Sequence, residues 1–352
     1  MMDLISGTSA SRLRQTTPTD PGTRWVKDAK PAIDAPPDPA NLPDPAALWP
    51  EGATRTGIAG VVTPRAVALP GGGYRMYYTQ ILPRAGFPAG ANDYDNSTTR
   101  ILSAYSADGR TWIPEAGVRL SPQQGGAGEF RVVSPDVAPA ADGSGRLRMY
   151  FECCPSAGTE PSVLRSAVST DGGLVWSVEP GVRFGAPGRS FMSARIVLLE
   201  DGRCRLYSGE RGRGIVSALS TDGGLTFAEE GGLRIGENES GGDAVVFAPE
   251  IIRLPAGGYR MYYAAYSAAN RAAILTALSS DGLAWRKDPV PVIQPDGNRW
   301  DAVKCSEMGV ICLPAPAGGA PRYRIFYEAC DGTARNERGV WRVAGAETAP
   351  EA

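Results

Sequence analysis

The residues best suited to chemistry are charged side chains that fall at one position of an internal repeat. Each repeat contains an apolar strand, and the polar residue near the start of that strand differs from copy to copy. The set comprises Arg65, Asp136, Arg195, Glu250 and, two residues before the aligned Gly309, Glu307. Carboxylates at such a position could donate and accept protons, and guanidinium groups could hold an anion. We therefore predict that Asp136, Glu250 and Glu307 are catalytic and that Arg65 and Arg195 bind substrate.

The chain has 352 residues and not one histidine. This absence excludes a Ser-His-Asp triad, a Cys-His pair and histidine metal ligands. No cofactor is expected, and acid-base chemistry must use carboxylates, Tyr, Lys or Cys. A thiolate metal site is an alternative, although the spacing of the six cysteines matches no zinc signature. Its ligands would be Cys153, Cys154, Cys305 and Cys330.

A second set of polar residues lies in the loops expected around the same end of the repeats. Long unequal loops on one rim commonly form the wall of a substrate site. Further substrate-binding candidates are Asp95, Glu152, Glu210, Tyr266, Trp300, Asp301 and Glu328. Trp300 could stack on a sugar ring. The alternative is that the charges only pair with one another and line a wet channel.

The repeats themselves predict an all-β fold. One copy reads TPRAVALPGGGYRMYY followed by RILSAYSADGRTW (63 to 112), and four similar copies follow. Aligned positions are separated by 71, 59, 55 and 59 residues, which is enough for four strands each. The sequence therefore predicts a five-bladed β-propeller with four-stranded antiparallel blades starting near residues 58, 130, 190, 245 and 302. Asp-Gly pairs near the end of four copies predict hairpin turns.

The fifth copy lacks its last strand, and residues 22–34 near the N-terminus resemble the missing segment. Trp25 would then correspond to Trp112, Trp176, Phe227 and Trp285. An N-terminal strand that completes the last blade removes an open sheet edge. We predict one propeller domain over residues 21–346, with flexible segments at 1–20 and 347–352. Residues 36–50, with six prolines, would form an extended crossing to the first blade.

Some residues recur in every copy and should therefore serve the scaffold. One arginine stands in each second strand: Arg75, Arg148, Arg205, Arg260 and Arg324. A planar guanidinium can bind carboxylates and carbonyl groups together, so we predict that these side chains join neighbouring blades.

Composition narrows the range of partners. A formal net charge of −2 gives no field that would attract nucleic acid or an anionic membrane. The N-terminal residues lack the pattern of a signal peptide, so a cytoplasmic location is expected unless such a peptide has been removed. The expected partner is a carbohydrate or another small molecule, and the oligomeric state stays open.

The blade pattern, with SPDV around Asp136 and APEI around Glu250, resembles the five-bladed propeller glycoside hydrolases. This group includes arabinanases, xylosidases, arabinofuranosidases and fructan hydrolases. The resemblance implies that Glu250 is the general acid and that Asp136 is one of the acidic residues of the site. The group usually has a carboxylate on the first inner strand, where this chain has Arg65. Glu307, Asp95 or another rim carboxylate would then replace it, or the reaction differs.

The sequence leads to a glycosidase hypothesis in which Glu250 protonates the leaving oxygen and Asp136 or Glu307 acts as base or nucleophile. Arg65 and Arg195 suggest a substrate that carries an anionic group. Two alternatives stay open: a non-hydrolytic propeller that binds carbohydrate or a small metabolite, and an enzyme of specialised metabolism that reuses the same funnel.

Overall fold

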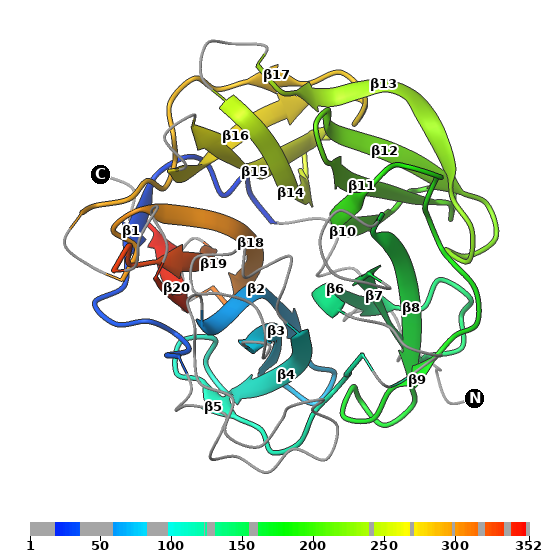
Figure 1. Ribbon diagram of the computed structural model, residues 1–352, viewed down its shortest axis with the longest axis horizontal. Coiled ribbons are helices and arrows are strands. Elements are labelled where there is room, and N and C mark those ends of the chain that lie inside the picture. The colour runs from blue at the N-terminus through cyan, green and yellow to red at the C-terminus, as the bar shows by residue number, and fades with distance from the viewer. Residues whose placement is uncertain are drawn as a thin grey trace, which may run out of the picture.

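The computed structural model describes residues 18–35, 59–82, 98–122, 124, 131–154, 161–238, 243–267, 271–297, 300–315, 321–333 and 339–349. Every regular element in these residues is a β-strand, so the fold is all-β as predicted. The described strands surround the middle of the molecule, and the chain passes around that centre once in sequence order (Figure 1). Asp95 and the proline-rich crossing at 36–50 lie outside the described residues.

Consecutive strands pair antiparallel in groups. Group one is β2 (Ala59–Ala68), β3 (Tyr74–Leu82), β4 (Thr98–Ser106) and β5 (Ile113–Pro114). Group two is β6 (Arg131–Pro139), β7 (Leu147–Cys154), β8 (Val163–Ser169) and β9 (Ser177–Val178). Group three is β10 (Phe191–Leu198), β11 (Cys204–Glu210), β12 (Gly214–Ser220) and β13 (Ala228–Gly236). Group four is β14 (Asp243–Arg253), β15 (Tyr259–Ser267), β16 (Ala272–Ser279) and β17 (Arg286–Lys287). Group five is β18 (Lys304–Leu313), β19 (Arg322–Cys330), β20 (Val340–Thr348) and β1 (Trp25–Lys27).

The groups are not all separate sheets. Groups two and three each form a four-stranded sheet, whereas the other groups join into one mixed sheet of twelve strands. The joins are short parallel contacts: Ala272 pairs with Lys304, and Ala59 and Gly60 pair with Val340 and Trp341. In Figure 1 the first strand of each group (β2, β6, β10, β14, β18) faces the centre and the fourth strands lie outside. The first strands therefore carry the residues that can meet at the middle.

Each of these inner strands contains a β-bulge just before the position aligned with Arg65. The register shifts by one residue between Val62 and Arg65, and at the corresponding place in the other inner strands. Four of the bulges contain a non-glycine residue with φ between 52° and 54°: Thr63, Ser134, Ser193 and Ala248. In three of these a proline follows, and proline suits a bulge because it has no N–H to offer a ladder.

The bulges correct one detail of the repeat alignment. Arg65 lies past the middle of β2 rather than at its start, because the residues before the bulge also belong to the strand. In the fifth inner strand Gly309 faces Phe326, two residues after Arg324, as Arg65 faces Tyr77, two residues after Arg75. The alignment of Gly309 with Arg65 is therefore confirmed, and Glu307, two residues earlier, lies within the bulge of β18.

Three of the repeated arginines join consecutive groups, as predicted, whereas Arg324 binds Asp28 and Glu347 of its own group. Arg148 donates Nε and Nη2 to Glu179, at 2.8 and 3.1 Å, and Nη1 to the Gly223 carbonyl of group three, at 2.7 Å. Arg75 repeats this with Glu115 and Gly172, and Arg205 with Glu230 and Asp281. One side chain thus ties its own fourth strand to the next group's Asp-Gly turn.

Replacing Arg148 with alanine should lower the free energy of unfolding by about 2 kcal/mol, because three hydrogen bonds involving a charged group are lost. A denaturant titration measures this loss. Arg146→Ala is the matched control, since Arg146 makes an exposed ion pair with Asp142 and such pairs contribute less than about 1 kcal/mol. Equal effects of the two substitutions would contradict the scaffold role.

The N-terminal residues form the corresponding contacts between groups four and five. Arg260 of group four binds Asp20 through two 2.6 Å hydrogen bonds, and the Tyr262 hydroxyl donates to the Gly22 carbonyl at 2.6 Å. Trp25 meets Tyr262 edge to face at 5.8 Å. Trp176, Phe227 and Trp285 meet Tyr77, Tyr150 and Tyr207 in the same way. Residues 19–25 therefore contact group four in the way that the Asp-Gly turns of groups two, three and four contact the preceding group.

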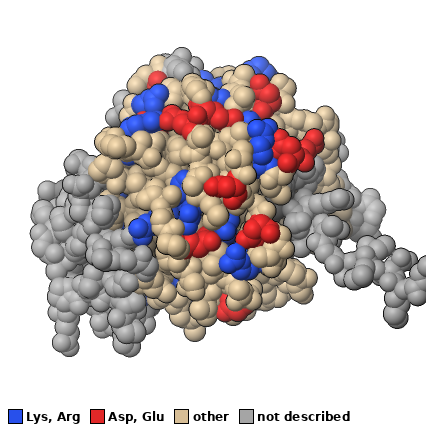
Figure 2. Space-filling view, turned by 90° about the vertical axis from the view of Figure 1, so that its right-hand side faces the viewer, with Lys and Arg blue, Asp and Glu red and all other residues tan. Residues whose placement is uncertain are grey.

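The surface carries charges of both signs. On the face in Figure 2 basic and acidic side chains alternate, and neither sign forms a continuous expanse. The described residues form no helix that is long and apolar enough to cross a membrane.

Candidate functional site

The predicted residues of the inner strands meet in a buried network of ion pairs. Arg65 Nε lies 2.8 Å from Asp136 Oδ1, and its Nη1 contacts both carboxylate oxygens of Glu250. Arg195 Nε lies 3.1 Å from Glu250, and its Nη2 lies 3.3 Å from Glu307 Oε1. Five side chains from five inner strands are thus linked in the order Asp136, Arg65, Glu250, Arg195 and Glu307. We call these five residues the central network.

The central network is deeply buried. Asp136 is 0% exposed and Arg65, the most exposed member, is 9% exposed. Burial acts to lower the pKa of Arg65, but the charges of Glu250 and Asp136 outweigh it and the net shift is upward. Both arginines face carboxylates, which compensate their charges. These five side chains do pair with one another, as one of the alternatives from the sequence proposed.

Backbone and hydroxyl donors complete the carboxylate contacts. Asp136 accepts the Ile196 N–H at 2.9 Å, and Glu250 accepts the Val310 N–H at 3.2 Å. Glu307 Oε2 accepts the hydroxyls of two bulge residues, Ser134 at 3.1 Å and Ser193 at 2.6 Å. The bulges thus aim serine hydroxyls at the one carboxylate that lies within a bulge. Sequence reasoning missed these serines, although the repeated Ser-Pro and Ser-Ala before Asp136 and Arg195 could have indicated them.

Two more predicted residues lie close to Glu307. Burial raises the pKa of Glu328 to about 8, and the charge of Glu307 adds to the shift. Burial also raises the pKa of Glu152 to about 6, with Arg131 acting in the opposite direction and Glu307 adding to the rise. The site therefore contains carboxyl groups with very different proton affinities, which is the arrangement that acid-base catalysis uses.

The other predicted residues have separate partners. Glu210 accepts hydrogen bonds from Arg189 and Arg213 at 2.6 to 2.7 Å. Asp301 binds Lys27 at 2.5 Å and the Tyr327 hydroxyl at 3.0 Å, so it fastens β1 to group five. Trp300 packs against the core between groups four and five. Tyr266 stacks on Phe247 at 5.4 Å, and burial raises its pKa.

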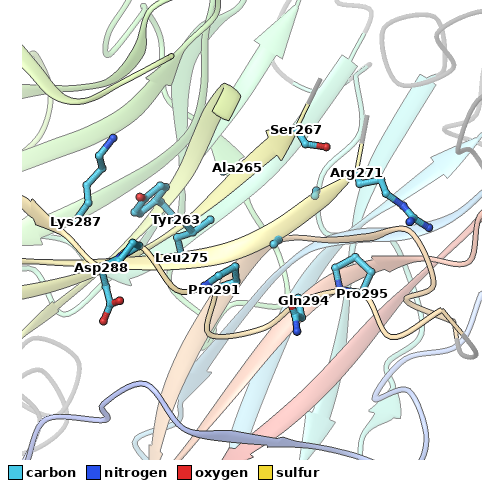
Figure 3. A pocket seen from close by; sticks show the side chains of 13 residues that line it. Tyr263, Ala265, Ser267, Arg271, Leu275, Lys287, Asp288, Pro291, Gln294 and Pro295 are labelled. Atoms are coloured by element: carbon cyan, nitrogen blue, oxygen red, sulfur yellow. The ribbon is translucent and has the colours of Figure 1, made fainter. Parts of the chain in front are cut away.

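Two described cavities differ in their relation to these residues. One, of about 450 Å³, has Arg65 and Glu250 in its lining together with later residues of β2, β14 and β18. It therefore lies on the side of the central network away from the strand starts. The other, of about 710 Å³, runs along β15, β16 and residues 287–295 (Figure 3). None of the predicted site residues within the described ranges lines the larger cavity.

The described residues hold no group of three Cys, Asp or Glu side chains arranged to bind a metal ion. Cys153, Cys154, Cys305 and Cys330 are all buried. Burial raises the pKa of Cys330 to about 11 and that of Cys305 well above its usual value. Cys305 and Cys330 are therefore poor metal ligands, because a metal binds the thiolate.

Comparison with solved structures identifies the fold. A glycosyl hydrolase from Bacteroides ovatus superposes with a TM-score of 0.67 at 17% identity, covering 92% of this chain and 93% of that one. The chain has the fold of the propeller glycoside hydrolases. An endo-arabinase from Bacteroides thetaiotaomicron gives 0.56 at 16% identity, with coverage of 83% and 94%. The resemblance read from the sequence is thus confirmed at the level of the fold.

This fold also supports another reaction. An N-acetylgalactosamine deacetylase from F. plautii, solved in complex with blood group B trisaccharide, gives a TM-score of 0.62 at 17% identity, covering 90% of this chain and 95% of that one. No protein-family model and no curated protein matches the sequence. The residues of the site must therefore carry the functional argument.

Proposed function

We propose that this protein hydrolyses a glycosidic bond with carboxyl groups at the centre of a five-bladed propeller. The strand groups, with β1 as the fourth strand of group five, are the proposed blades, and residues 21–346 form the single domain. The observation that carries the proposal is the meeting of Asp136, Glu250 and Glu307, from three different groups, in one network. Glycoside hydrolysis needs two carboxyl groups on either side of the bond.

Glu307 is the best placed of these residues to act as base or nucleophile. It accepts hydrogen bonds from Ser134 and Ser193, and only one of its oxygens faces Arg195. Glu250, in contrast, is held by Arg65, Arg195 and the Val310 N–H. All three are hydrogen-bond donors, which leaves Glu250 poorly suited to give up a proton. Asp136 and Glu250 then serve to fix the arginines and so to position Glu307.

The substrate in this proposal is a carbohydrate without a required anionic group. The anionic substrate suggested by the sequence depended on Arg65 and Arg195 being available to it. Both guanidinium groups are occupied by carboxylates, so they do not favour an anion on the ligand.

A panel of aryl glycosides and plant or microbial polysaccharides tests the proposal. Glu307→Gln should lower kcat by about 10² to 10⁴-fold on any substrate that the wild type cleaves, which is the usual contribution of a catalytic acid or base. Glu179→Gln, which changes a carboxylate at the rim of group two, is the control and should keep full turnover. If Glu307→Gln and Asp136→Asn both keep full turnover, the scheme is wrong.

A second candidate is a carbohydrate-binding protein without hydrolytic activity. The observation that favours it is Arg65, which neutralises Asp136 and Glu250 where related enzymes usually have a carboxylate. Calorimetry would then detect tight binding of a glycan from the panel, with no sugar released on long incubation. Release of sugar that depends on Glu307 would exclude this candidate.

A further inference from the structure

We infer that Glu328, on the second strand of group five, is the proton donor of the site. This inference rests on the proposed hydrolysis and changes its general acid from the residue that the sequence indicated. It concerns a side chain that stands outside the central network but beside Glu307. Three observations on contacts, position and charge support it.

The first observation is that no arginine or lysine of the described residues forms an ion pair with Glu328. Among the described buried carboxylates of this region, Asp136, Glu250, Glu307, Glu152, Glu210 and Asp301 each form an ion pair with an arginine or lysine. Glu328 is 5% exposed and its partners are neutral: the Ser306 hydroxyl at 2.6 Å and the Thr63 N–H at 3.3 Å. A buried carboxyl group without a compensating charge favours its neutral, protonated form.

The second observation is the position of Glu328 relative to Glu307. Ser306, which contacts Glu328, immediately precedes Glu307 in the bulge of β18. Thr63, which also contacts Glu328, is the bulge residue of β2. Glu328 therefore faces the bulges, on the strand-start side of the central network. Glu328 and Glu307, the residue proposed as base or nucleophile, are thereby placed next to each other.

The third observation is the electrostatic environment. Glu307 on β18 repels a charge on Glu328, and Tyr266 on β15 and Cys330 on β19 are neutral groups that interact with it. From β2, Thr63 contributes only an N–H to the described contacts. The pKa of about 8 agrees with this arrangement. Glu328 can thus hold a proton at neutral pH beside the carboxyl group of Glu307.

The repeat carries unlike residues at the position of Glu328. Glu328 stands four residues after the repeated Arg324, and the corresponding residues are Thr79, Glu152, Gly209 and Ala264. Only Glu152 among these four is charged, and it pairs with Arg131. The scaffold therefore does not require a carboxyl group at this position, whereas a reaction would.

In the reaction the glycosidic C–O bond breaks, and the proton of Glu328 moves to the leaving oxygen. The oxygen of a water molecule finally bonds to the anomeric carbon, and the two protons of that water go to the new hydroxyl group and back to a carboxylate. Glu307 receives the proton directly if it acts as base. If Glu307 first bonds to the anomeric carbon, Glu328 takes the proton from water in the second step.

The dependence of kcat/KM on the leaving group tests whether Glu328 is the proton donor. We would compare wild type and Glu328→Gln on glycosides whose leaving groups range from a dinitrophenol to an alkyl alcohol or a sugar. The variant should lose about 10² to 10⁴-fold in kcat/KM on the poor leaving groups and only a few-fold on dinitrophenol, which needs no proton. Glu179→Gln should show no such gradient. An equal loss of kcat/KM on all substrates, or no loss on any of them, would overturn the assignment.

A stability measurement tests protonation without relying on turnover. A carboxyl group whose folded pKa is raised stabilises the fold at low pH and costs stability as pH rises towards that pKa. Glutamine mimics the protonated form, because its oxygen can accept the Thr63 N–H and its amide can donate to Ser306. The Tm of Glu328→Gln relative to wild type should therefore rise between about pH 5 and pH 8.

A Tm difference between Glu328→Gln and wild type that does not change over this pH range would overturn the inference whatever the activity. If the wild-type protein cleaves no glycoside, the proposed hydrolysis is wrong, and so is the catalytic role of Glu328. The pH dependence of stability would still report the proton on Glu328, so the two failures can be told apart.

Discussion

Replacing Arg65 with alanine is expected to lower the free energy of unfolding at neutral pH by about 3–5 kcal/mol, the usual cost of removing one partner from a buried ion pair. Arg65 is charged, buried and in contact with Asp136 and Glu250. Its loss would leave two buried carboxylates close together without the guanidinium that compensates them. Denaturant titration of wild type and variant at several pH values measures the effect.

The loss of stability in Arg65→Ala should become smaller as the pH is lowered. Without Arg65, burial and mutual repulsion raise the pKa of Asp136 and Glu250 in the folded variant. A carboxyl group with a raised folded pKa binds its proton more tightly in the folded state, so acidification stabilises the fold. The difference in free energy of unfolding between wild type and Arg65→Ala should therefore become smaller as pH falls from 7 towards 5. A difference that becomes larger on acidification would contradict the described contacts.

A compensated variant separates charge from packing. Arg65→Met combined with Asp136→Asn and Glu250→Gln removes the three charges and keeps the side chains close to their original size. Buried ion pairs replaced as a set by neutral groups often cost little stability. The triple variant should therefore be more stable than Arg65→Ala alone. If it is less stable, hydrogen-bond geometry rather than charge compensation holds the centre together.

The repeat made the fold predictable from sequence. The recurring arginine, the Asp-Gly turns and the terminal aromatic residue each serve a contact between neighbouring groups, so they recur with the group. The bulges were less visible, because a one-residue register shift leaves the apolar pattern almost unchanged. That is why Arg65 was expected at a strand start.

The site was only partly predictable for a different reason. Sequence could show that unlike charges share a repeated position, but not which of them neutralise one another. That depends on distances across the centre, such as those from Arg65 to Asp136 and Glu250. Glu328 appeared as one more rim carboxylate, because its lack of a positive partner is a property of the folded chain.

The contacts of Trp25 lead to the second large effect. Trp25→Ala is expected to destabilise the protein by about 3–5 kcal/mol, as truncation of a packed tryptophan usually does. Trp25 packs on the core between groups four and five and meets Tyr262 edge to face. It also anchors β1, which has only three residues and pairs with β20. Loss of the ring therefore weakens the attachment of the whole strand.

The loss should extend beyond the ring because the neighbours of Trp25 hold other parts of group five. Lys27 binds the buried Asp301, and Asp20 binds Arg260. If β1 detaches, the carboxylate of Asp301 loses its positive partner and the edge of β20 is exposed. Val26→Ala is the matched control, since Val26 lies between these residues but is 57% exposed, and it should change stability by less than about 0.5 kcal/mol. Hydrogen exchange should also show faster exchange of the β20 amides in Trp25→Ala than in Val26→Ala. Equal stability and exchange in the two variants would mean that group five holds together without its N-terminal strand.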